Sequence, residues 1–315
     1  MMLTRRQFLQ RASALAALLG MAHSHEAATS ASLAALICGA TLGVPPEAAL
    51  LGRLFKTAEV RAKPQPSAKV VKQLPAQSLQ PILGVSADGW WYQLADGYLP
   101  RQAMQPILPY VPPPQPCALC KGYYEVIAPS TTLRDACTPY ARINGSYPFG
   151  TVFYVHDWLI DDKHQAWYAL TKTADGSGFL SWANALHFRL WLPQPSPLKE
   201  PTLWLDGPQQ MLSLYDGEAF IGSTAIHAAP LPRGSAKLQL GLPCTSAAEA
   251  PYLHLWQMLL YLPLGKPVPL YGANWHNHFG TPSASRAVEL PVLAARHLYT
   301  LLSGTGLTEF PVVIT

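Results

Sequence analysis

The chain has 315 residues, which is too long for one small module and short for three large domains, so two or three compact units are expected. Apolar residues make up 49% and charged residues 13%, which excludes a disordered chain. The net charge is +4 and the positive residues are scattered, so no nucleic-acid-binding surface is predicted. No apolar run reaches the roughly 20 residues that a membrane-spanning helix needs.

Residues 1–45 are predicted to be an export signal and leader. The pair Arg5-Arg6 is followed by the uncharged stretch 12–22 and then by small residues. This pair, with Phe-Leu two residues later, resembles the twin-arginine signal, which exports folded proteins; an ordinary basic leader is the alternative. A second apolar stretch, 30–44, fits an anchor, a short helix or part of the leader. The leader therefore predicts a protein of the cell envelope or the outer face of the cytoplasmic membrane, with at most a single N-terminal anchor.

Four cysteines beyond the leader are candidates for structural disulfides in an oxidising compartment, namely Cys117, Cys120, Cys137 and Cys244. The first two form a CxxC pair, but a proline run precedes it instead of the strand-to-helix turn of a redox motif. A zinc site would need a second pair of ligands. The sequence therefore predicts no metal site and no cofactor, and it leaves the disulfide pairing open.

Two proline-rich seams, 108–121 and 191–201, divide the rest of the chain and are typical of semi-rigid extended spacers. They separate the segments 53–107, 122–190 and 202–315. The first two segments consist of short alternating runs broken by Gly, Pro and Asp, which predicts two small β-barrels. The third is predicted to be mostly β with a short helix near its end, so the whole chain is expected to be mainly β.

Both small segments resemble the bacterial SH3-like module, which commonly attaches envelope proteins to cell-wall or peptide ligands. The shared features are a Leu/Val-Arg opening, a Trp-Tyr-x-Leu strand and a closing Gly-Tyr/Phe-Leu, found at Val60-Arg61, Trp91–Leu94 and Gly97–Leu99, and at Leu133-Arg134, Trp167–Leu170 and Gly178–Leu180. We predict that Trp91 and Trp167 fill the cores. The extra tryptophans are candidates for an exposed groove, namely Trp90, Trp158 and Trp182; the alternative is that the barrels are spacers.

The third segment carries local signals for each kind of element. Asp216-Gly217 lies between two strand-like runs and predicts a hairpin. A helix is predicted over 291–302, with Pro in its first turn. Its predicted buried face consists of Leu293, Ala294, His297, Leu298 and Leu301. The chain is predicted to end in a strand at 311–315.

The stretch Tyr271–Leu290 resembles the catalytic domain of the L,D-transpeptidases (the YkuD family), which cross-link peptidoglycan. Wall-building members read His-Gly-x-x-Trp-His-Asn-x-Phe-Gly-Thr-Pro, then Ser-His-Gly-Cys-Val-Asn-Leu. Three parts of the chain match in register, namely Trp275–Asn277, Phe279–Pro282 and Val288-x-Leu290. The resemblance covers about 115 residues, and its specific part is 271–302. It implies a partner in the wall, such as a peptidoglycan stem peptide.

The departures from that pattern fall on the chemistry. Ala287 stands at the position of the nucleophilic Cys, Ser285 at the activating His, Arg286 at the Gly between them, and Tyr271 at the upstream His. Cysteine catalysis needs a thiolate beside a base, and both are missing. No intact catalytic set is therefore predicted. The candidate cleft or binding residues are Trp275, His276, Asn277, His278, Arg286 and Glu289.

Three hypotheses remain. In the first, the protein binds stem peptides or an envelope partner without catalysis, with Arg286 pairing with a carboxylate; this requires an open cleft around Trp275 and Arg286. In the second, it is a transpeptidase or carboxypeptidase with a relocated nucleophile, which requires a Ser or Cys within hydrogen-bonding distance of a His; the candidates are Ser285, Ser283 and Cys244. In the third, it is a protein-binding scaffold whose cleft Tyr271 and Arg286 fill.

Overall fold

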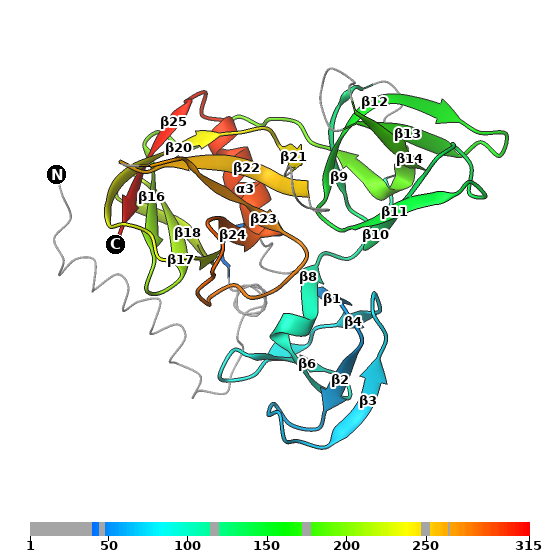
Figure 1. Ribbon diagram of the computed structural model, residues 1–315, viewed down its shortest axis with the longest axis horizontal. Helices are drawn as coiled ribbons and strands as arrows, with labels where there is room; N and C mark the ends of the chain where they lie inside the picture. Colours follow the sequence, from blue (N-terminus) through cyan, green and yellow to red (C-terminus); the bar gives the residue numbers. More distant parts are fainter. Residues whose placement is uncertain (1–39, 44–47, 114–119, 172–177, 247–252, 264) are drawn as a thin grey trace.

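The computed structural model describes residues 40–43, 48–113, 120–171, 178–246, 253–263 and 265–315. The chain folds mainly into β-strands, as predicted, and forms three bodies (Figure 1). Residues 1–39 of the predicted leader lie outside the described residues, as does Cys117. Across the described ranges, no helix has the length and apolar character needed to cross a membrane.

The first body, module 1, holds its strands in two small sheets. One has the order β4-β1-β8 and the other β3-β2-β7-β6-β5. The strands are β1 (Leu51–Leu54), β2 (Ala58–Arg61), β3 (Val70–Leu74), β4 (Leu79–Pro81), β5 (Gly84–Val85), β6 (Trp91–Leu94), β7 (Gly97–Pro100) and β8 (Met104–Ile107). Trp91 is 7% exposed, which confirms its predicted place in the core, whereas Trp90 is 46% exposed.

The second body, module 2, is one antiparallel sheet in the order β11-β10-β14-β13-β12-β9-β15. Its strands are β9 (Gly122–Val126), β10 (Ser130–Arg134), β11 (Ile143–Pro148), β12 (Val152–Ile160), β13 (Ala166–Thr171), β14 (Phe179–Asn184) and β15 (Phe188–Leu190). Trp167 is 2% exposed and packs in the core, as predicted. Trp158 and Trp182 are half-buried, so of the three candidate groove tryptophans Trp90 is the exposed one.

The C-terminal body is built on a ten-stranded sheet with the order β18-β17-β16-β25-β20-β22-β23-β24-β19, and β21 pairs with β22 beside this path. The strands are β16 (Pro201–Asp206), β17 (Met211–Asp216), β18 (Ala219–Ala225), β19 (His227–Ala228), β20 (Gly234–Leu240), β21 (Cys244–Ser246), β22 (Leu253–Tyr261), β23 (Val268–Ala273), β24 (Val288–Pro291) and β25 (Glu309–Ile314). The predicted hairpin is β17–β18, where Gly217 has φ +56°. The predicted last strand, β25, lies between β16 and β20.

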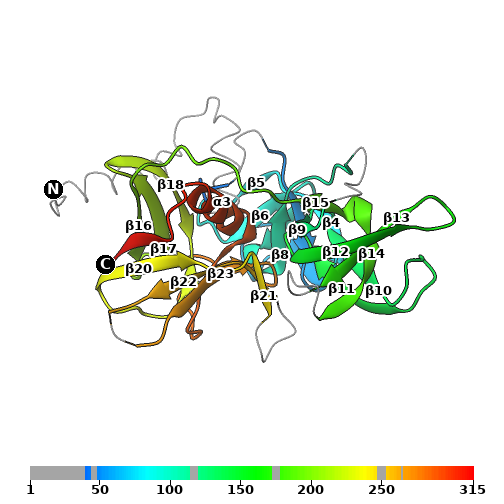
Figure 2. The same cartoon turned by 90° about the horizontal axis from the view of Figure 1, so that it is seen from above.

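The helix α3 (Val292–Ser303) lies across one face of this sheet, against β22 and β23 (Figure 2). Its existence and its proline are as predicted, with Pro291 at the N-cap. The predicted buried stripe is wrong at His297, which is exposed. Leu293, Ala294 and Leu298 are buried as predicted, and the buried face also includes Val292, Ala295, Tyr299 and Leu302. The rotation of the helix about its axis is set by its packing on the sheet and by an ion pair of 3.2 Å from Arg296 to Glu125 of module 2.

The seam at 191–201 packs against the C-terminal body. The Trp191 ring lies edge-on to Trp256 and Tyr299, at centroid distances of 5.6 and 5.5 Å, and its Nε1 donates to Thr300 Oγ1 at 3.0 Å. Leu198 is also buried, with 7% of its surface exposed. Because its apolar residues meet the C-terminal body, this seam is fixed along that body.

Candidate functional site

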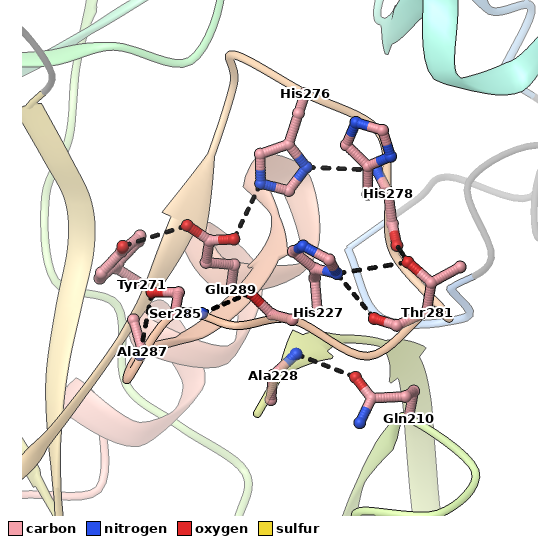
Figure 3. Close-up of polar contacts among 11 residues, drawn as sticks. Gln210, His227, Ala228, Tyr271, His276, His278, Thr281, Ser285, Ala287 and Glu289 are labelled. Carbon is pink, nitrogen blue, oxygen red and sulfur yellow. Dashed lines mark hydrogen bonds and ion pairs between the residues drawn. The ribbon is translucent and has the colours of Figure 1, made fainter. Parts of the chain in front are cut away.

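The site residues gather around Glu289, which lies on β24 between two other strands. In the sheet register, Glu289 is opposite Tyr271 of the parallel neighbour β23 and opposite His227 of the antiparallel neighbour β19. Directly opposed residues on neighbouring strands point to the same face. Figure 3 shows the three side chains on one side of the sheet, with His276 above them.

Two donors hold the buried Glu289 carboxylate, which belongs to a residue that is 7% exposed. The Tyr271 hydroxyl donates to Oε1 at 3.1 Å, and His276 Nε2 donates to Oε2 at 2.9 Å (Figure 3). Burial alone would raise the pKa of Glu289. The hydrogen bonds from His276 and Tyr271, together with the nearby imidazoles, lower it by more than burial raises it, so the net pKa lies below its usual value. Burial and the Glu289 charge raise the pKa of Tyr271, which therefore stays a neutral donor.

Three imidazole rings lie in mutual contact. The ring centroids are 5.2 Å apart for His227 and His276, 5.8 Å for His227 and His278, and 5.4 Å for His276 and His278. His276 Nδ1 accepts the backbone N–H of His278 at 3.2 Å, and His227 Nδ1 donates to the carbonyl of Thr281 at 2.6 Å. Burial and the two neighbouring imidazoles lower the pKa of His278. Among the described residues, no group of three His, Cys, Asp or Glu side chains is placed to hold a metal ion.

The turn at 283–287, where the transpeptidase motif has its Cys and His, contains no activated nucleophile. The Ser285 hydroxyl accepts the N–H of Ala287 at 3.2 Å, and the Ser283 hydroxyl accepts the N–H of Ser285 at 2.9 Å (Figure 3). Ala287 is buried and Arg286 is exposed. In the part of the chain that the structure describes, neither serine forms a hydrogen bond with a histidine. These hydroxyls therefore stabilise the turn.

Cys244 belongs to a different part of the C-terminal body. It is 2% exposed in β21. Strand β21 contacts β12 of module 2. Burial, together with the nearby Cys244 and Tyr154, raises the pKa of the Tyr123 hydroxyl. Within the described ranges, Cys137 forms no disulfide, and because Cys117 lies outside them the disulfide pairing stays a prediction.

The cavity at this site is small. Its volume is about 20 Å³, which is roughly the room that one water molecule needs. His276, Asn277 and Phe279 line it, together with Gln105 of module 1 and the first turn of α3. Trp275 and Arg286 do not belong to this lining, so the cavity is not the aromatic-lined cleft around these two residues that the binding hypothesis requires.

The loop that carries His276 and His278 is bonded to module 1 through Asn277. This side chain is 3% exposed, and its Nδ2 donates to the Tyr92 hydroxyl at 2.8 Å, the Met104 carbonyl at 3.0 Å and the Arg101 carbonyl at 3.2 Å. Asn277 was predicted to be a cleft residue. It lines the small cavity, and its amide is bonded to module 1.

The same loop is fastened to module 2 through Asn274. Its Nδ2 donates to the Phe149 carbonyl at 3.1 Å and to Thr151 Oγ1 at 2.9 Å. Arg53 of module 1 donates to the Asn274 carbonyl at 3.1 Å, and burial lowers the pKa of Arg53 to about 10. We call residues 274–277 the clamped loop, because both modules hold it.

Sequence reasoning missed His227, Asn274 and Arg53. Asn274 directly precedes the matched Trp-His-Asn, so its position offered a weak signal. His227 and Arg53 carry no local signal, because their roles depend on strand pairing and on contact between bodies.

No protein-family model matches the sequence, and no curated protein matches it significantly. Solved structures do show a likeness. Three of these structures are L,D-transpeptidases. One from Stackebrandtia nassauensis is 14% identical with a TM-score of 0.31, and the match covers 39% of this chain and 58% of that one. LdtMt1 in complex with imipenem is 11% identical with a TM-score of 0.31, and the match covers 48% of this chain and 91% of that one.

A third such structure is an L,D-transpeptidase from Mycobacterium tuberculosis H37Rv. It is 11% identical with a TM-score of 0.27, and the match covers 67% of this chain and 90% of that one. Identities and TM-scores this low assign neither a family nor an activity to the chain.

Proposed function

We propose that the protein is an exported cell-envelope protein whose L,D-transpeptidase-like C-terminal domain binds peptidoglycan stem peptides or an envelope partner without catalysing cross-links. The motif match over 271–290 supports the relationship. The observation that carries the loss of catalysis is the turn at 283–287. Ala287 is buried there at the nucleophile position, and the hydroxyls of Ser283 and Ser285 are engaged by backbone N–H groups.

The chemistry of acyl transfer explains why this arrangement is inactive. A thiolate must attack the acyl carbon, and a base must first take its proton. The methyl group of Ala287 has no lone pair to attack with. His276 has both ring nitrogens engaged, by Glu289 and by the N–H of His278. Loss of one member of a catalytic set costs several orders of magnitude in rate even where the rest is intact.

The proposed ligand contact lies on the surface of the turn, because the cavity that His276 and Asn277 line has room for only about one water molecule. Arg286 is exposed there, and a guanidinium can pair with the carboxylate of a stem peptide through two parallel hydrogen bonds. The exposed Trp90 gives module 1 a flat apolar surface that a ligand can contact. In this proposal the two SH3-like modules add wall or partner contacts to those of the turn.

A second function, that of a protein-binding scaffold, is favoured by Tyr271. At the position of the upstream His, its ring is 5% exposed and stacks on His254 at a centroid distance of 4.1 Å and an angle of 14°. Its hydroxyl is bonded to Glu289, so the ring and the carboxylate fill the space beside the turn. A site filled in this way serves a partner that recognises the outer surface.

The test is a pull-down of the purified mature chain with intact peptidoglycan sacculi, followed by mass analysis of the released muropeptides. Binding with unchanged muropeptides supports the first function. Arg286→Ala should weaken that binding, whereas Arg142→Ala, an exposed arginine of module 2, is the matched control. No binding and no turnover favours the scaffold.

New cross-links or trimmed stem peptides would refute the loss of catalysis. The alternative is then a transpeptidase or carboxypeptidase with a relocated nucleophile. The variants Ser283→Ala, Ser285→Ala and Cys244→Ala would locate it.

A further inference from the structure

Residues 40–43 cover the free edge of the C-terminal sheet. β18 is the outermost strand on its side, and Ala40 forms an antiparallel bridge with its Thr224. The Thr41 N–H donates to the Ser223 carbonyl at 2.9 Å, and the Ser223 N–H donates to Thr41 Oγ1 at 2.8 Å. Both main-chain groups of Ser223 are thereby satisfied at an edge that would otherwise be open to pairing with another chain. We call residues 40–43 the edge cap.

The edge cap is also part of the apolar core. Leu42 is 2% exposed and Ala40 is 4% exposed. A Cβ atom at Gly222 would lie 2.9 Å from Leu42 Cδ2, so the glycine allows this close approach. Gly43 has φ +75°, and a Cβ there would lie 2.3 Å from the Leu293 carbonyl oxygen of α3.

The edge cap reaches the candidate site as well. Ala40 lines the same small cavity as His276 and Asn277. The contacts with β18, with α3 and with this cavity show that the sequence of 40–43 is fitted to the folded domain.

We propose that the leader is removed N-terminal to Ala40 and that the edge cap stays in the mature protein. This moves the end of the leader back from the predicted residue 45, and it rests on the proposed export. A peptidase needs an accessible, extended chain, whereas the twin-arginine route exports proteins that are already folded. In the folded domain residues 40–42 are bonded to β18, and Ala40 and Leu42 are buried. The cleavable bond therefore lies before them.

The first test is the mass and N-terminal sequence of the processed protein purified from the envelope fraction. We expect a start at or before residue 40. A start after residue 40, or an uncleaved chain in the envelope, overturns this inference and leaves wall binding untouched. A chain that stays in the cytoplasm refutes the proposed export itself, so the two failures are distinguishable.

The second test does not depend on export. Chains that begin at residue 40 and at residue 48 are produced in the cytoplasm and melted. The longer chain should melt at a clearly higher temperature, and Leu42→Ala within it should lower the melting temperature by about 4 °C or more. The matched control is Leu242→Ala, because Leu242 is 53% exposed. Equal melting of the two chains, or of Leu42→Ala and its parent, overturns the role of the edge cap.

Discussion

The clamped loop makes a quantitative prediction for Asn277→Ala. In the folded protein, the Asn277 amide donates to the Tyr92 hydroxyl and to the carbonyls of Met104 and Arg101, at 2.8 to 3.2 Å. Removing it leaves buried acceptors of module 1 without their donor. Each such group costs about 1–3 kcal/mol, and the amide has two hydrogens, so we expect a loss of about 2–6 kcal/mol in the free energy of unfolding.

The assay is thermal unfolding followed by calorimetry and by tryptophan fluorescence. Because Asn277 joins the C-terminal body to module 1, the loss should lower the melting temperature by at least about 4 °C. The control is Gln239→Ala, which removes one exposed hydrogen bond to Glu309 and should shift the melting temperature by no more than about 2 °C. Equal shifts for the two variants would refute the idea that the loop is held through Asn277.

Three further predictions concern the site. Glu289 has a lowered pKa in the folded state, so its ionised form stabilises the fold above pH 4.5, its ordinary pKa, and this stability is lost as the pH falls through the lower folded pKa. Glu289→Gln should therefore flatten the fall in melting temperature at acid pH, and an unchanged slope would contradict this role. Ala287→Cys should be alkylated slowly by iodoacetamide, with a thiol pKa above the ordinary value of about 8.5 because the position is buried. Adding Ser285→His should lower that pKa, and identical pH profiles would show that the two positions do not face each other. Arg53→Lys should cost about 1–3 kcal/mol in unfolding experiments, because an ammonium cannot reproduce the fork that reaches Asn274 and Gln105; a cost near zero would show that the fork is dispensable.

Features set by neighbouring residues were predictable from the sequence. Asp216-Gly217 marks a hairpin because glycine takes the positive φ that the turn needs. The helix at α3 and the mainly β fold follow from the spacing of apolar residues and from prolines. The buried Trp91 and Trp167 follow from the alternation of their strands. The predicted loss of catalytic residues at 285–287 rests on a mismatch in an otherwise matching motif.

Tertiary structure decided everything that depends on a distant partner. His227 joins the site because the sheet places β24 between β23 and β19, and a lone histidine in the sequence gives no sign of this pairing. His297 faces solvent because the packing of α3 on the sheet decides which side of the helix is buried. The spacing of apolar residues in the sequence places that side only to within about one residue. Asn277 points into module 1 because its buried amide finds acceptors there. Local patterns encode the period and the turns of each element, whereas partners are selected by burial and hydrogen bonding in the assembled fold.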